Sequence, residues 1–326
     1  MRTAALALVA LAAFSPLRSA GMVYEDRTWI AATAQPATTW LPMRPLMHVS
    51  WWFQSRYTPS PQAFHALNLA LHVTLALLVA LLAWRLSAGA LSVWLAGALT
   101  LLHPMTVESV AYLSARTELF AAIGVVGACA LSVHARGWRW LLVYAALAFG
   151  MAGKETAAIG FLLIPLTRWA VGRDWYPSLV LGSFALAWGI SLKGGWSEVI
   201  ALGEVGSWMH TDWLSWLLIQ STATVRLISL SLIPFFGGFT VDYDYDLIPH
   251  TLRLAALLTL TAIPVLAWKV RHTRPLLAFG LAWMLIAVAP RLIVQTPRSY
   301  LNEHQFLVAF LGLAIAGASL TQKATT

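Results

Sequence analysis

The chain is poor in charged residues. Of its 326 residues, only 10% are Asp, Glu, Lys or Arg, while 59% are hydrophobic. A soluble globular enzyme is excluded, because ordinary soluble domains carry about 25% charged residues. A disordered chain is excluded as well, because disorder requires low hydrophobicity and high charge. The mean hydropathy of +0.72 instead indicates an integral membrane protein whose helices cross a bilayer core about 30 Å thick.

Cysteine and acidic residues are also scarce. Cys129 is the single cysteine, which excludes an internal disulfide and any multi-cysteine metal site. There are 13 acidic residues against 21 basic ones, and the net charge is +8. The basic residues lie singly between apolar runs and form no patch, so we expect no nucleic-acid partner. No Gly-rich phosphate loop or nucleotide fingerprint is present, so a soluble nucleotide sugar or ATP is not expected as the direct substrate.

The hydrophobic residues gather in eleven apolar segments. They predict a single all-α domain, residues 1–326, built as a polytopic transmembrane bundle of about 10–11 membrane helices. For the first segment, Arg2 before the apolar run leaves a signal peptide as an alternative to a retained helix. The segments lie near residues 3–20, 65–86, 89–103, 118–134, 138–152, 156–171, 177–193, 213–234, 253–270, 275–295 and 305–320.

The basic residues between these segments predict the orientation. Turns at 85, 136–139 and 168–173 carry arginines and fall in the cytoplasm if the N-terminus does, as the positive-inside rule requires. The next basic cluster, 269–274, falls inside only if one earlier segment does not cross. The best candidate is 213–234, because an arginine in mid-membrane is costly. We therefore expect ten crossings, with 213–234 as a re-entrant or interfacial helix.

This topology predicts that nearly all the acidic residues lie on the outer side. Of the 13 Asp and Glu residues, only Asp174 is expected to face the cytoplasm. The others fall on the outer side, in the polar stretches 21–63, 194–213 and 235–252 or at nearby helix ends. Either an outward-facing active site or the solvation of longer outer loops would explain the gathering, and we expect both to contribute.

The first outer loop opens with two adjacent acids, Glu25 and Asp26. A carboxylate there could serve as a general base if burial or a like-charged neighbour disfavours its ionised form. The alternative is ordinary solvation of short acids at the membrane interface.

Polar residues within the apolar segments form two further groups. His65, Asn68 and His72 share one helical face, and we favour hydrogen bonds between helices over a metal site. His103 precedes Glu108 and Arg116, which with Tyr112 between them are spaced by four and would line one face of a helix. Such a face can place an acid and a base near a phosphate or a sugar, or it can hold a structural ion pair.

Several cations lie near the expected outer boundary. Lys154, followed by Glu155, suits an anionic headgroup or phosphate, with a snorkelling lysine at a helix end as the alternative. Arg226 and Arg298 could bind a phosphate bidentately, and a lipid-linked phosphate presented from the bilayer fits them best. Asp242, Asp244 and Asp246 alternate as in a cation loop but lack the rest of the EF-hand pattern. They leave a divalent metal open as a cofactor.

In this order, the motifs resemble those of the GT-C glycosyltransferases, in particular the transmembrane O-mannosyltransferase group and its bacterial relatives. The resemblance runs over nearly the whole chain. The chain departs from the family's pattern at three points. It has Glu-Asp where Asp-Asp is usual and Gln305-Phe306 where an Arg and a Tyr are commoner. It also has no tetratricopeptide repeats. The matching residues are Glu25-Asp26, Arg44-Pro45-Leu46, Phe64-His65 with Asn68 and His72, Leu102-His103-Pro104, Glu108-Ser109-Val110-Ala111, Arg116, Lys154-Glu155, Pro234, Asp242-Tyr243 and Asn302-Glu303-His304.

The resemblance implies a fold, a reaction and a place in the cell. The fold would be a GT-C bundle in a membrane, expected to be the bacterial inner membrane, with its site facing the periplasm. The reaction would move a sugar from a polyprenyl-phosphate donor to a hydroxyl of a secreted protein or glycolipid, with Asp26 as base and Glu25 beside it. The remaining matches, with Arg226 and Arg298, would bind donor and substrate: Arg44, His65, His103, Glu108, Arg116, Lys154, Glu155, Glu303 and His304.

Two other classes of protein stay open. A transporter or lipid-linked sugar flippase is the main alternative, although such proteins commonly show internal repeats and none is visible here. A non-catalytic membrane scaffold fits less well, since it would not require arginines and acids at the same face.

Overall fold

Helices make up all the regular secondary structure in the part of the chain that the computed structural model describes. Those residues are 9, 12–23, 26–28, 44–180, 182–183, 212–234, 244–293 and 300–322. No strand occurs among them, which confirms the predicted all-α class. The chain divides into two compact units, Met1–Gly160 and Phe161–Thr326, and each is described by itself.

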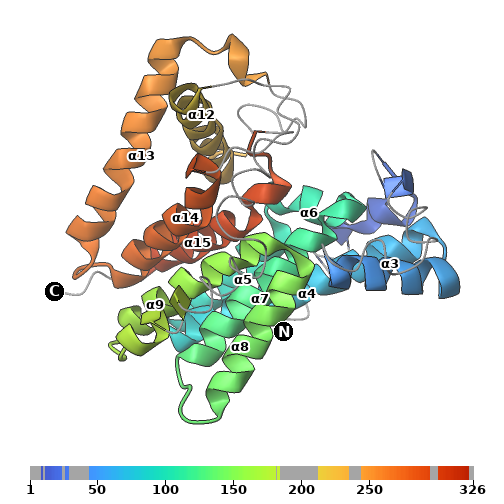
Figure 1. Cartoon of the computed structure of the whole chain (residues 1–326), viewed down its shortest axis with the longest axis horizontal. Coiled ribbons are helices and arrows are strands. Elements are labelled where there is room, and N and C mark those ends of the chain that lie inside the picture. Colours follow the sequence, from blue (N-terminus) through green and yellow to red (C-terminus); the bar gives the residue numbers. More distant parts are fainter. Residues whose placement is uncertain are drawn as a thin grey trace. The chain divides into compact units, whose positions relative to one another are not determined.

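The first unit is built around α7 (Arg116–Ser132), which packs against α4 (Pro61–Arg85) and α8 (Arg139–Gly153). On its other side α4 contacts α5 (Ala90–Leu102), and Figure 1 shows these helices side by side. Nearly every side chain of α7 is buried, so this helix forms the core of the unit. The shorter elements are η1 (Ser15–Arg18), α3 (Pro45–Tyr57), η3 (Pro104–Thr106), α6 (Val107–Ala111), η4 (Leu113–Ala115) and η5 (Glu155–Ile159).

Helix α4 shows how local sequence sets the length of a possible membrane span. The Ser60 hydroxyl accepts a hydrogen bond from the Ala63 N–H at 3.2 Å, and Pro61 occupies the first turn, where its missing N–H costs nothing. The helix then runs 25 residues to Arg85, about 37 Å. That length exceeds the roughly 30 Å of a bilayer core.

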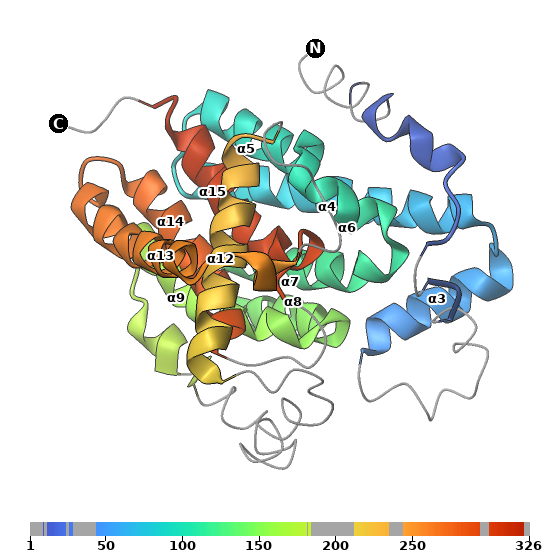
Figure 2. The same cartoon turned by 90° about the horizontal axis from the view of Figure 1, so that it is seen from above.

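Helix α3 precedes α4 in the chain (Figure 2). Its inner face buries Met47 and Trp51 against Phe64 of α4 and Leu113. This apolar cluster fixes the N-terminal end of α3, and therefore Arg44, which immediately precedes the helix, on the first unit.

Four of the described helices are long and apolar enough to cross a membrane: Pro61–Arg85, Leu113–Ser132, His250–Val270 and Pro275–Ile293. The pair Ala90–Leu102 and Pro104–Ala111 would make a fifth span if it is one helix bent by 53°. Pro104 explains this bend, because proline cannot donate the hydrogen bond that would continue α5. The structure is thus compatible with a membrane protein.

The ten crossings expected from the sequence stay a prediction. Two of the other apolar segments form helices of only 15 and 13 residues, α8 and α15 (Leu307–Ser319). Two more segments, near 3–20 and 177–193, lie largely outside the described residues.

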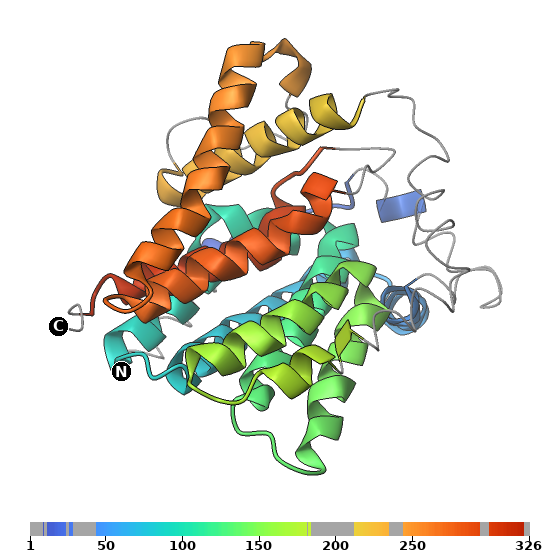
Figure 3. The ribbon, with the colours of Figure 1, turned by 60° about the vertical axis from the view of Figure 1, so that its left-hand side comes forward.

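The second unit takes in α9 (Gly160–Ala170) after its first residue. Its other long helices are α12 (Trp213–Leu232), α13 (His250–Val270), α14 (Pro275–Ile293) and α15. Consecutive helices of this set pack against each other, as Figure 3 shows for the orange and red ribbons. The contact between α14 and α15 includes a hydrogen bond of 2.8 Å from the Trp283 indole N–H to the Val308 carbonyl. Two short helices, η6 (Tyr245–Leu247) and η7 (His304–Phe306), complete the unit.

The contact between α7 and α8 depends on a glycine. A methyl group at Gly124 would lie 2.4 Å from the Gly150 Cα, whereas one at Gly127, a turn later, would meet only the Ala146 Cβ at 3.9 Å. We expect Gly124→Ala to lower the free energy of unfolding by about 1–3 kcal/mol, as overpacking does. Gly127→Ala is the matched control and should be neutral or stabilising, since alanine favours helices. Equal thermal midpoints of the two variants in detergent would contradict this interpretation of the helix contact.

Candidate functional site

The chain breaks its helix just before α7. Helix α6 ends at Ala111, Tyr112 has extended backbone, and η4 leads into Arg116. In a continuous helix, the Ser114 N–H would donate to the Val110 carbonyl. Here the Asn68 amide donates to that carbonyl at 3.3 Å, and the Ser114 N–H donates to the Asp26 carboxylate at 3.0 Å. Two side chains from other segments thus replace one helical hydrogen bond.

This break corrects one expectation from the sequence. Glu108, Tyr112 and Arg116 do not line one face of a single helix, because Glu108 lies in α6 and Arg116 begins α7. The spacing of four is present, but the hydrogen bonds of Asn68 and Asp26 stabilise a turn between the two residues. His103 starts this irregular stretch, and its Nδ1 accepts a hydrogen bond from the Met105 N–H at 3.1 Å.

Arg116 holds the break in place. Its guanidinium is fully buried and donates to the Asn68 side-chain oxygen at 2.7 Å, the Ser50 hydroxyl at 3.0 Å and the Phe64 carbonyl at 3.2 Å. These contacts join α3, α4 and α7. A buried guanidinium is tolerated only when its donors are satisfied, so the three acceptors make the start of α7 a rigid point.

Asp26 is attached to this rigid point. Its carboxylate is fully buried, and Oδ1 accepts from both the Ser114 N–H at 3.0 Å and the Ser114 hydroxyl at 2.8 Å. Oδ2 accepts from the Val23 N–H at 3.2 Å. The Asp26 charge also interacts favourably with the Arg116 guanidinium. The residue is therefore a buried acid in a fixed orientation, while Glu25 lies outside the described residues.

The polar residues of α4 make hydrogen bonds to other segments, as predicted. The His65 Nε2 lies 3.3 Å from the Gly21 carbonyl oxygen, and the His72 Nε2 lies 3.3 Å from the Leu101 carbonyl oxygen. With the Asn68 contact described above, they join α4 to the segment after η1, to α5 and to α6. A search of the described residues for three or more metal-ligating side chains in one place finds none, and Asp242 lies outside those residues.

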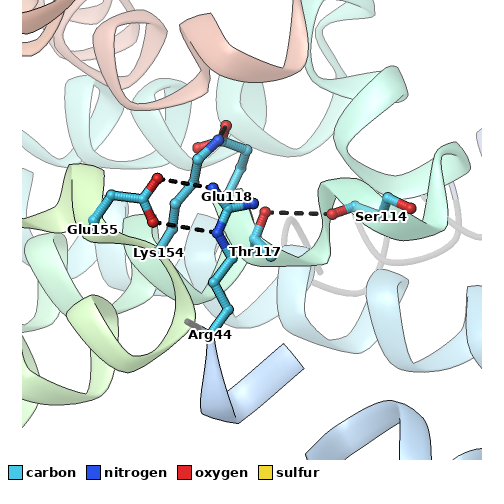
Figure 4. A network of polar contacts seen from close by, with 6 residues as sticks. All are labelled: Arg44, Ser114, Thr117, Glu118, Lys154 and Glu155. Atoms are coloured by element: carbon cyan, nitrogen blue, oxygen red, sulfur yellow. Dashed lines mark hydrogen bonds and ion pairs between the residues drawn. The ribbon is translucent and has the colours of Figure 1, made fainter. Parts of the chain in front are cut away.

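Two ion pairs meet at Lys154 and Glu155, which follow α8 (Figure 4). Lys154 pairs with Glu118 of α7, and both side chains are buried. Arg44 pairs with Glu155 through two hydrogen bonds, from Nε at 3.2 Å and from Nη2 at 2.8 Å. The interpretation of Lys154 as a snorkelling lysine is wrong, because its ammonium group lies inside the first unit.

Glu118 is not among the candidate site residues predicted from the sequence. Its position in the first turn of an apolar helix, two residues after Arg116, is the signal that identifies it in retrospect. A lone ionised acid buried among apolar residues is stable only when a cation pairs with it. In this fold Lys154 is that cation.

The pair between Arg44 and Glu155 is partly exposed. The side chains are 34% and 53% accessible to solvent. Burial raises the pKa of Glu155, but the charge and hydrogen bonds of Arg44, helped by Lys154, lower it, and the net pKa lies below the ordinary value. A lowered carboxyl pKa stabilises the fold above the unfolded pKa, and this stabilisation is lost as the pH falls through the folded pKa.

Replacing Glu155 by glutamine tests whether this stabilisation is present at neutral pH and lost in acid. We expect a loss of only about 0.2–1 kcal/mol in the free energy of unfolding at neutral pH, the usual magnitude for an exposed pair. The difference from wild type should shrink as the pH is lowered from neutral to an acidic value below the folded pKa, where Glu155 is protonated in both states. Thermal unfolding at the two pH values measures it, and a difference that grows in acid would contradict the assignment. Arg44→Gln should behave in the same way.

A second group of polar residues lies in the second unit. Arg226 of α12 pairs with Glu303 at 3.4 Å, and the Leu301 N–H donates to the side-chain oxygen of the buried Gln220 at 3.2 Å. His304 begins η7 directly after Glu303. Arg226 thus has a carboxylate partner, while Arg298 lies outside the described residues.

The predicted site residues therefore fall into two sets. The first unit contains Asp26, Arg44, His65, His103, Glu108, Arg116, Lys154 and Glu155, and the second contains Arg226, Glu303 and His304. Comparison of the chain with protein-family models, with curated proteins and with solved structures found no match.

Proposed function

We propose that the protein is a membrane glycosyltransferase of GT-C type that uses a polyprenyl-phosphate sugar donor. The observation that carries the proposal is the Asp26 carboxylate, which is fixed by Ser114 and Val23 beside the Arg116 charge. A carboxylate has about four acceptor sites, and donors among the described residues use three of them. One site is left for a proton, as a general base requires.

In the proposed reaction, Asp26 takes the proton of an acceptor hydroxyl. The hydroxyl oxygen forms a bond to the anomeric carbon of the sugar, and the bond from that carbon to the phosphate oxygen breaks. The electron pair leaves with polyprenyl phosphate, so the charge that develops there must be stabilised. Because Asp26 is fully buried, the acceptor has to displace part of its cover on binding.

Arg44 is the cation of the first unit best suited to the phosphate. Its side chain is one-third exposed, and Glu155 uses only its Nε and one N–H of Nη2, which leaves further guanidinium donors for a phosphate oxygen. Lys154, already paired with Glu118, would act on the phosphate only by exchanging partners. In the second unit, Arg226 and Arg298 are the proposed phosphate contacts, and Glu303 and His304 follow Arg298 in the sequence. His65, His103, Glu108 and Arg116 would shape the pocket.

A transfer assay tests the proposal. The full chain is purified in detergent, placed in liposomes and supplied with a panel of short-chain polyprenyl-phosphate sugars and a hydroxyl acceptor, either a serine-rich peptide or a glycolipid. Sugar attached to the acceptor, found by mass spectrometry, supports the function. Movement of the labelled lipid across the bilayer with no transfer would replace it by the flippase alternative, with the site expected at the periplasmic face in either case.

A further inference from the structure

Ser114 makes an unusual pair of contacts. Both its N–H and its hydroxyl donate to the same oxygen of Asp26, at 3.0 and 2.8 Å. Two donors fill the two lone pairs of Oδ1. Within the described part of the chain, Oδ2 receives only the Val23 N–H, at 3.2 Å, so the remaining acceptor site of the carboxylate belongs to Oδ2.

The segment that carries Ser114 is itself fixed. The Thr117 hydroxyl donates to the Ser114 carbonyl at 3.3 Å (Figure 4). Two residues after Ser114, the buried Arg116 binds Asn68, Ser50 and the Phe64 carbonyl. Ser114 is thus a donor on a rigid support.

We propose that Ser114 is a positioning residue that holds Asp26 by Oδ1 and leaves Oδ2 as the atom that accepts the proton. This inference rests on the proposed function for its kinetic consequence only. A hydroxyl that donates to a carboxylate favours the ionised form over the protonated form. Ser114 therefore orients the base without touching the substrate.

The kinetic test compares Ser114→Ala with Ser114→Thr. The alanine variant loses the hydroxyl contact and should lower kcat about 10- to 100-fold, the rate equivalent of one hydrogen bond to a charged group. KM should change little, since Ser114 contacts no substrate. Threonine retains the hydroxyl and should recover most of the rate. Ser132→Ala removes a buried hydroxyl at the other end of α7, which donates to the Cys129 carbonyl, and should leave kcat unchanged.

A second measurement does not depend on activity. Dicyclohexylcarbodiimide reacts with protonated carboxyl groups, so its attachment to Asp26, read by mass spectrometry, reports how readily that carboxyl is protonated. Labelling at a given pH should rise severalfold in Ser114→Ala and stay at the wild-type level in Ser114→Thr.

Each outcome either supports or overturns the proposed role of Ser114. The inference stands if labelling follows this pattern, even when the wild type transfers no sugar, a result that removes only the proposed function. It is overturned if Ser114→Ala labels like wild type. In an active protein it is also overturned if kcat is unchanged, or if kcat and thermal midpoint fall together and threonine restores neither.

Discussion

Asp26→Asn is expected to lower the rate of sugar transfer by about 10²- to 10⁴-fold, the usual contribution of a general base. The amide is too weakly basic to take the acceptor proton. The fold should survive, because the amide oxygen can still accept both Ser114 donors in place of Oδ1. The contact to the Val23 N–H and the interaction of the Asp26 charge with the Arg116 guanidinium are lost, at a cost of about 1–3 kcal/mol. Initial rates with saturating donor, together with the thermal midpoint in detergent, measure the two effects separately.

Glu25→Gln is the control for this variant, since it neutralises the neighbouring acid of the same motif. We expect a smaller fall in rate than for Asp26→Asn. If the two results are reversed, the base is Glu25 and Asp26 is a structural residue that stabilises the break before α7. Near-normal rates in both variants would remove the first outer loop from the proposed chemistry.

Much of the helical framework could be predicted from hydrophobicity alone. The apolar segment 65–86 corresponds to α4, 213–234 to α12 and 275–295 to α14, each within four residues at its ends. This agreement has a simple cause. A helix satisfies its own backbone hydrogen bonds, so its limits depend mainly on local sequence, such as Ser60 and Pro61 at the start of α4.

The break before α7 could not be predicted in this way. Residues 107–119 contain no proline and no glycine, and their spacing favours a continuous helix. The break is stabilised by Asn68 and Asp26, which lie about 40 and 90 residues earlier in the chain. A contact between distant segments has no local signal, so the position of Ser114 beside Asp26 emerges only from the fold.

The ion pairs show the same limit. The sequence places Lys154 next to Glu155 and suggests no partner for either, and it gives no reason to connect Lys154 with Glu118. The fold separates the adjacent residues, because Lys154 points into the unit toward α7 while Glu155 meets Arg44 at its surface (Figure 4). Because charged residues are scarce, each one can be identified from the sequence as a candidate site residue. Which of them form ion pairs depends on how the helices pack.

The buried pair provides the largest expected effect on stability. Lys154→Met should lower the free energy of unfolding by about 3–5 kcal/mol, because it leaves the Glu118 carboxylate buried without a cation. Both side chains are less than a tenth exposed, so water cannot take the place of the lysine. Thermal unfolding in detergent at neutral pH measures the loss, and the exposed partner variant Glu155→Gln serves as the comparison.

The double variant Glu118→Leu with Lys154→Met separates the cost of an unpaired charge from the contribution of the pair itself. Replacing both ions by apolar groups of similar size is often neutral or stabilising, so the double variant should recover most of the stability lost in Lys154→Met. It should at the same time reduce sugar transfer if Lys154 exchanges Glu118 for the donor phosphate. A double variant as unstable as the single one would show that the destabilisation comes from lost packing and not from an isolated carboxylate. Recovered stability with full activity would leave Arg44 as the phosphate contact of the first unit.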